Sequence, residues 1–148
     1  MAFLGQFEYT LDAKNRLTIP PKFRGPLSDG VVLAKELDTC VSIWPMAGWL
    51  AHTEQMLGAR DRLDPEVRDL QRLIHAGAYE GQLDSAGRLM LPHPLIERVG
   101  LEKEVTMIGN FDSIEVWDRG HWAKRQPELD SQASDIAQRL ATRDREGR

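Results

Sequence analysis

The sequence predicts a β-rich α+β protein made of two tandem copies of one folding unit. First, the nine-residue element Asp12–Pro20 returns 72 positions later as Asp84–Pro92. Second, each copy contains short runs that alternate apolar and polar residues, which is typical of β-strands. Third, each copy closes on a tryptophan-bearing segment that reads as a helix. Two copies indicate an internal duplication rather than a solenoid.

The duplication divides the 148 residues into four parts. We expect copy one at 5–52, a helical connector at 53–76, copy two at 77–124 and a C-terminal helical tail at 125–148. Halves of about 45 residues rarely bury enough apolar surface to fold alone. The two copies should therefore pack on each other or on neighbouring chains.

Each copy opens with a strand, at Gln6–Leu11 and at Tyr79–Leu83. A four-residue turn follows, and it begins with aspartate, whose side chain favours turn starts. At the last turn position Asn15 or Gly87 can supply a positive φ.

The second strand of each copy alternates, with Arg16 and Thr18 facing out and Leu17 facing in, and residues 88–91 repeat the pattern. Proline then ends each strand because it has no amide hydrogen to donate. Proline also suits the first turn of a helix, so short helices are expected at Pro21–Arg24 and Pro94–Val99, the latter capped by Gly100.

Two further strands are expected in each copy, near Val31–Lys35 with Val41–Ile43 and near Val105–Ile108 with Ser113–Val116. The connector contains an amphipathic helix, Asp64–His75, capped by its aspartate. Helices bearing tryptophan should start at Pro45 and Asp118. After Pro127 the tail Glu128–Arg148 reads as a polar, charge-mixed helix.

Enzyme function is not indicated by any motif. The four histidines show no metal-ligand spacing, and a single cysteine, Cys40, forms no pair. Phosphate loops, nucleophile elbows and zinc-protease motifs are absent from the sequence. We therefore expect no catalysis, no metal and no cofactor. No stretch reads as a secretory signal or a membrane span, so the expected location is the cytoplasm.

The local distribution of charge points to an anionic partner although the whole chain carries −4. From Asp12 to Arg24 there are four basic residues and one acidic residue, a net +3. The basic residues of this stretch are Lys14, Arg16, Lys22 and Arg24. The matched stretch in copy two has only Arg88 against Asp84, a net charge of zero. A cluster of basic side chains favours binding of an anionic partner. Guanidinium groups can bond both phosphate oxygens and the acceptor edge of guanine.

Asp12 and Asp84 admit two interpretations. In the favoured one, each aspartate bridges its turn to the arginine four residues on and is structural. In the other, they belong to an interface motif.

The repeated Asp-x-x-x-Arg-Leu-x-[Ile/Leu]-Pro element and the run Phe111–Asp118 resemble the swapped-hairpin DNA-binding motif of the AbrB/SpoVT superfamily. Two copies in one chain resemble the MraZ family of transcriptional regulators. The resemblance covers about residues 3–124 and implies two swapped-hairpin halves that form an internal pseudo-dimer. It also implies ring-shaped homo-oligomers and binding to repeated promoter boxes, upstream of its own gene and of a division and cell-wall gene cluster. A nucleoid-associated location follows.

Matched to this sequence, the family's DNA-contacting arginine falls on Arg16, with Lys14 beside it and Arg88 as the counterpart in copy two. The family's Lys-Gly-Arg is here Lys14-Asn15-Arg16. Ala86 replaces the lysine in copy two, and Leu4 stands where a basic residue is common. The DNA-binding role of copy two should therefore be weaker or structural.

Two other functions remain open. An antitoxin-type interaction module would pair with a toxin, but such proteins usually carry one copy and a disordered apolar tail. A plain oligomeric scaffold is compatible with the acidic total. We expect a DNA-binding regulator whose partners are double-stranded promoter DNA and further copies of the chain.

Overall fold

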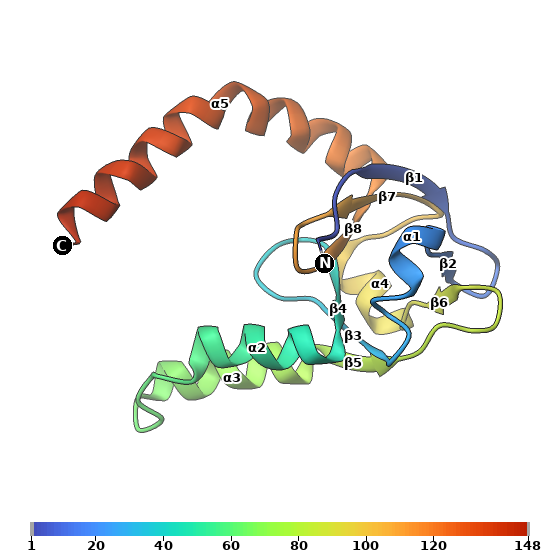
Figure 1. The fold of residues 1–148 in the computed structure, drawn as a ribbon, viewed down its shortest axis with the longest axis horizontal. Coiled ribbons are helices and arrows are strands. Elements are labelled where there is room, and N and C mark those ends of the chain that lie inside the picture. Colours follow the sequence, from blue (N-terminus) through green and yellow to red (C-terminus); the bar gives the residue numbers. More distant parts are fainter. Residues whose placement is uncertain (1, 148) are drawn as a thin grey trace. The chain divides into compact units, whose positions relative to one another are not determined.

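The computed structural model describes residues 2–147, so Arg148 at the end of the expected tail lies outside them. The fold is mixed α+β (Figure 1). The chain divides into two compact units, one ending at Asp118 and one beginning at Arg119. Within the first unit the elements are β1 Gln6–Thr10, β2 Arg16–Thr18, α1 Pro21–Arg24, β3 Val31–Ala34, β4 Val41–Pro45, α2 Met46–Leu57, α3 Pro65–Ala76, β5 Ala78–Gly81, β6 Arg88–Met90, α4 His93–Val99, β7 Glu104–Gly109 and β8 Ile114–Asp118.

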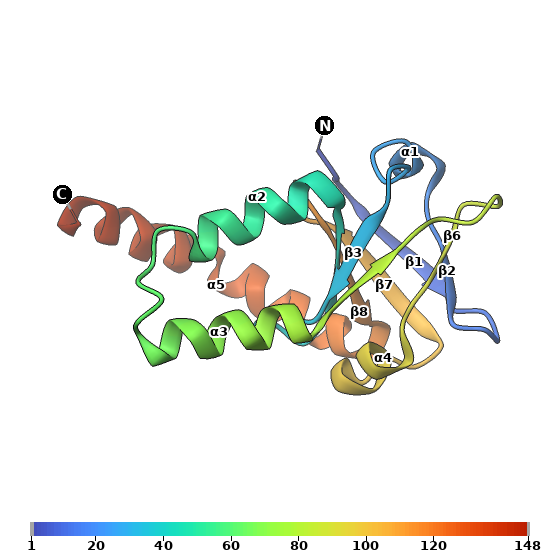
Figure 2. The same cartoon turned by 90° about the horizontal axis from the view of Figure 1, so that it is seen from below.

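The main sheet has six antiparallel strands in the order β1-β7-β8-β4-β3-β5 (Figure 2). The first strand of each copy pairs with the third strand of the other: β1 lies against β7, and β5 lies against β3. At the centre Ser42 lies opposite Glu115, and Val41 and Ile43 lie opposite Val116 and Ile114. The two copies thus exchange strands across an approximate internal two-fold axis.

The second strands leave this sheet and form a separate two-stranded ribbon, β2 with β6. Leu17 and Leu89, at its centre, are almost fully buried. They join one hydrophobic core with residues of the sheet, α1 and α4, including Phe23 and Leu95. Because the apolar face of the ribbon is held by this core, its other face is fixed toward solvent.

Local signals in the sequence are confirmed at several element ends. The side chain of Asp64 accepts a hydrogen bond from the amide of Glu66 and caps α3. Gly100 ends α4 with a left-handed backbone, φ 69°. Asn15 and Gly87 have φ of 58° and 75°. A smaller core holds Trp44, Trp49 and Ile74 beneath the helices α2 and α3.

The second unit consists of one helix, α5 Arg119–Glu146. The sequence suggested a tryptophan-bearing helix from Asp118 and a separate helix after Pro127. The structure instead joins them, because Pro127 is accommodated inside one 28-residue helix. Proline removes one backbone hydrogen bond there, which a long helix tolerates at a cost of about 3 kcal/mol. Among the described residues no helix has the length and apolarity needed to cross a membrane.

Candidate nucleic-acid interface

The ribbon presents four side chains to solvent. Arg16 lies opposite Met90, and Thr18 lies opposite Arg88, on either side of the buried Leu17–Leu89 pair. Equivalent positions of the repeat are therefore exchanged by a two-fold axis through that central pair. Met90 is 59% exposed, as the alternation of residues 88–91 predicts. The two arginines lie on a diagonal of this face, a relation that places residues roughly 7–8 Å apart in sheets.

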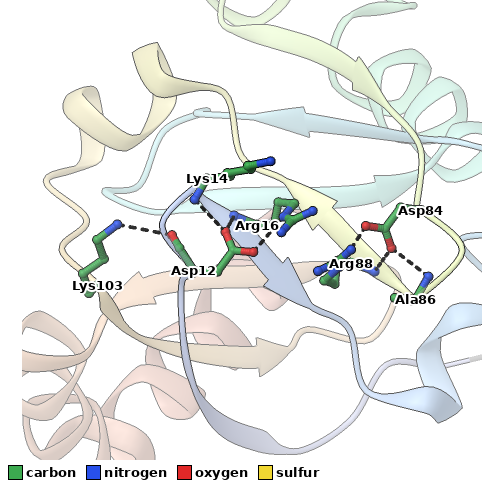
Figure 3. A network of polar contacts seen from close by, with 7 residues as sticks. All are labelled: Asp12, Lys14, Arg16, Asp84, Ala86, Arg88 and Lys103. Carbon is green, nitrogen blue, oxygen red and sulfur yellow. Dashed lines mark hydrogen bonds and ion pairs between the residues drawn. The ribbon is translucent and has the colours of Figure 1, made fainter.

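Asp12 holds Arg16 in place from the turn before β2 (Figure 3). Its Oδ1 accepts hydrogen bonds from the amides of Lys14 and Arg16, both at 2.9 Å. Its Oδ2 accepts from Arg16 Nε at 2.7 Å. One carboxylate thus closes the turn and orients the guanidinium.

Copy two repeats this geometry. Asp84 Oδ1 accepts from the amides of Ala86 and Arg88 at 2.9 Å, and Oδ2 accepts from Arg88 Nε at 2.9 Å (Figure 3). Each aspartate therefore bridges its turn to the arginine four residues on, as the favoured interpretation predicts. We call each aspartate with the arginine that it holds a clamp. In both clamps the arginine side chain bonds the aspartate through Nε alone. Within the described residues the Nη atoms of Arg16 and Arg88 make no hydrogen bond to the protein.

The hydrogen bonds keep both aspartates charged. The amide of Arg16 is the main cause that holds the pKa of Asp12 below its usual value of 3.8. Burial opposes it, and the guanidinium of Arg16 and the amide of Lys14 lower the pKa further. The amide of Arg88 does the same for the pKa of Asp84. Each arginine is thus partly exposed and paired with the aspartate of its own turn, and its Nη atoms are available to a ligand. Such groups can donate two parallel hydrogen bonds to phosphate oxygens or to guanine.

The remaining sequence-predicted cations surround the ribbon in different ways. Lys14 is exposed at the tip of its turn, and its ammonium makes no hydrogen bond within the described part of the chain. Lys22 Nζ lies 4.7 Å from the ring centre of Phe7 and 5.2 Å from that of Phe23. This cation–π contact fixes the lysine at the surface of α1.

Arg24 belongs to copy one but lies at the turn of copy two. Its Nε donates to the carbonyl of Ile19 at 2.8 Å. Its guanidinium also lies directly against the backbone of Gly87. Strand exchange thus brings a copy-one cation to the copy-two turn, which has Ala86 in place of a lysine.

Lys103, a cation of copy two, lies at the turn of copy one and was missed by sequence reasoning. Its Nζ donates to the carbonyl of Asp12 at 3.2 Å, so a copy-two cation lies at the copy-one turn (Figure 3). The sequence held no signal for it, because Glu102 and Glu104 flank it and make it look like an ordinary charged loop. The net charges of the two matched stretches, +3 in copy one and zero in copy two, therefore do not describe the charge around each turn in the folded protein.

A second polar cluster is built around Glu36, which lies between β3 and β4. Its carboxylate accepts from Ser42 Oγ at 2.9 Å and Trp44 Nε1 at 3.3 Å, and it pairs with His52. The ring of His52 stacks on that of Trp44, with centroids 4.0 Å apart. These groups satisfy one another and line an open pocket of about 340 Å³ with several acidic residues. Among the described residues, no group of His, Cys, Asp and Glu is arranged to hold a metal ion.

Comparison with known proteins gives the family. The sequence model of the family described as "MraZ protein", with "antitoxin-like" in its description, matches residues 2–73 and again residues 74–144. Curated relatives carry the name transcriptional regulator MraZ. The one from Acetivibrio thermocellus is 36% identical over 139 residues, which are 94% of this chain and 96% of the relative. The one from Thermomicrobium roseum is 35% identical over 140 residues, 95% and 98% of the two chains. The two matched regions agree with the tandem duplication, and this chain belongs to the MraZ family.

Proposed function

We propose that this chain is a sequence-specific DNA-binding transcriptional regulator, and that the solvent face of the β2–β6 ribbon contacts double-stranded DNA. The observation that carries the proposal is the pair of arginines on that face, each held through Nε by an aspartate of its own turn. A two-stranded ribbon fits the major groove of B-form DNA. A held guanidinium loses little freedom on binding, so its outer amines are suited to a base edge.

The roles divide between base contacts and phosphate contacts. We assign base contacts to Arg16 and Arg88, and attraction to phosphates to Lys14, Lys22 and Arg24. The names of the curated relatives support a role in transcription. We propose repeated promoter boxes as the target, upstream of the chain's own gene and of a division and cell-wall gene cluster. The proposed activity needs neither catalysis nor a cofactor.

The strand exchange supports the proposed architecture. We propose that residues 5–52 and 77–124 are two swapped-hairpin domains of AbrB/SpoVT type that form an internal pseudo-dimer. The connector 53–76 and the tail 125–148 complete the chain. The pairing of β1 with β7 and of β5 with β3 is what such an exchange requires.

Exposed apolar side chains support assembly of several copies. Leu4, Leu37 and Phe111 are 61%, 71% and 68% exposed. Together with the two open sheet edges, β1 and β5, they offer surface that a neighbouring chain can cover. We propose a homo-oligomeric ring, which would present many ribbons to tandem DNA boxes and gain affinity through effective concentration.

The antitoxin-type alternative has less support. The description of the matched family includes the word antitoxin-like. However, the chain has two copies, and its final unit is a polar helix with no buried residues rather than an apolar extended segment.

The test is a mobility shift on the chain's own upstream DNA. Arg16→Ala should weaken binding about 5-fold to 150-fold, since a bidentate base contact is worth about 1–3 kcal/mol. Arg88→Ala should also weaken binding, because its clamp has the same geometry. Affinity should fall steeply with salt, as counterions are released from phosphates.

The chain offers a matched control in Arg72 on α3. It forms an exposed pair with Asp69 at 2.9 Å, so Arg72→Ala removes an arginine and an arginine–aspartate pair without touching the ribbon. This control should bind like the wild type. Wild-type affinity in a folded Arg16→Ala variant would refute the proposed interface.

A further inference from the structure

The ribbon combines a symmetric framework with asymmetric side chains. The register pairs Arg16 with Met90, Thr18 with Arg88 and Leu17 with Leu89. A two-fold rotation about the central leucine pair therefore exchanges the two arginines. The two aspartate clamps, with nearly equal distances, follow the same rotation.

Among the positions that break this symmetry, one lies on the ribbon face and one at the turn tips. Thr18 in copy one is replaced by Met90 in copy two, and both are exposed beside an arginine of the other copy. Lys14 at the tip of one turn is replaced by Ala86 at the tip of the other, and both are exposed. None of these four side chains is required by the core.

The differing residues are suited to contact different parts of DNA. The hydroxyl of threonine can bond either kind of base edge, whereas an apolar side chain contacts the methyl group of thymine. A lysine attracts phosphate, whereas an alanine does not. A fully two-fold reader would bind a site equally well in both orientations. The differences at these positions remove that equivalence.

We propose that the ribbon reads a non-palindromic DNA box in one orientation, and that Thr18 and Met90 determine this direction, with Lys14 and Ala86 adding to it. The inference rests on the proposed function, because it assigns a direction to the same DNA-contacting face. Covalent duplication permits this, since the two copies can differ within one chain, which a dimer of identical chains cannot do.

The experiment uses the full chain and a pool of duplexes with random sequence, so no box needs to be known. Wild type and three variants select DNA from the pool. The first variant exchanges both pairs: Lys14→Ala, Thr18→Met, Ala86→Lys and Met90→Thr. The second makes these two positions identical in both copies with Ala86→Lys and Met90→Thr alone. The third is Arg16→Ala. All exchanged positions are exposed, so the fold should be kept.

Orientation is read by cleavage of DNA from an iron chelate on Glu102→Cys. This exposed position adjoins Lys103, which contacts the copy-one turn. The native Cys40 should not react, because it is buried and burial raises the pKa of its thiol. Cleavage on one side of the selected motif therefore reports which end of the ribbon lies there.

Wild type should select a motif that is not self-complementary and should cleave on one side, with a preference of about tenfold or more. The exchanged variant should select the same motif and cleave on the opposite side. The symmetric variant should cleave on both sides comparably.

An exchanged variant that keeps the wild-type direction, or a wild type that selects a palindrome and cleaves on both sides, would overturn the inference and leave the proposed function standing. If wild type selects no motif and Arg16→Ala binds the pool equally well, the proposed function fails and the inference fails with it.

Discussion

Gly87 offers a sharp test of how strand exchange places Arg24. The backbone of Gly87 has φ 75°, which an alanine adopts only with strain. A Cβ added there would lie 2.2 Å from Arg24 Nε and 2.4 Å from its Cζ. No real contact is so short, and therefore Gly87→Ala must move the guanidinium. The hydrogen bond from Arg24 to the carbonyl of Ile19 would then be lost.

The cost has two parts. Left-handed backbone costs alanine roughly 1–2 kcal/mol. The lost hydrogen bond adds about 1 kcal/mol, because Arg24 is only half-buried and water can replace part of it. Gly100→Ala isolates the first part, since Gly100 has φ 69° and nothing lies within 4 Å of its added Cβ. Gly87→Ala should therefore destabilise the protein by about 2–3 kcal/mol, and Gly100→Ala by about 1–2 kcal/mol.

The assay is a double-mutant cycle of Gly87→Ala and Arg24→Ala, measured by thermal unfolding at fixed protomer concentration because an oligomer makes Tm depend on concentration. In the Arg24→Ala background the clash is absent, so Gly87→Ala should cost only the strain. The two changes should thus be less than additive by about 1 kcal/mol, or roughly 2–4 °C in Tm. Additive effects, with Gly87→Ala equal to Gly100→Ala, would show that Arg24 does not lie on this turn.

Two further predictions concern acid and assembly. Asp12→Asn keeps an oxygen for the two amides but loses the charge that holds Arg16 Nε. The pKa of Asp12 is lowered below 3.8 in the folded state, so its stabilisation is present above that value and is lost as the pH falls through the folded pKa. Urea unfolding should therefore find the variant less stable at neutral pH and equal to wild type in strong acid, and a gap that persists in strong acid would contradict the clamp. For assembly, light scattering at micromolar concentration should give a mass several times 16.8 kDa, and a value near 16.8 kDa would refute the oligomer.

Much of the local structure could be predicted because its causes are local. Alternation of period two placed Leu17 and Leu89 inside and Arg16 and Arg88 outside, as the structure confirms. The turn residues predicted positive φ at Asn15 and Gly87. The spacing of four residues predicted the aspartate–arginine pairs, since a carboxylate that closes such a turn lies beside the next strand.

Pairing of strands could not be read from these patterns. The alternation of apolar residues in a strand predicts which face of the strand is buried, but it does not predict which strand pairs with it. The exchange of β1 and β5 between copies depends on contacts across the whole first unit. Pro127 was likewise misleading, because a proline penalty of about 3 kcal/mol lowers the stability of a helix without forcing it to end.

The sequence by itself determined the duplication, the family resemblance, the turn chemistry and the identity of the two outward arginines, since each depends on residues within one short segment. Only the tertiary structure decided which cations share a surface. It brought Arg24 to the turn of copy two and Lys103 to the turn of copy one. Charge acts through space, so a count along the chain assigns a cation to its own repeat, whereas strand exchange places it on the other.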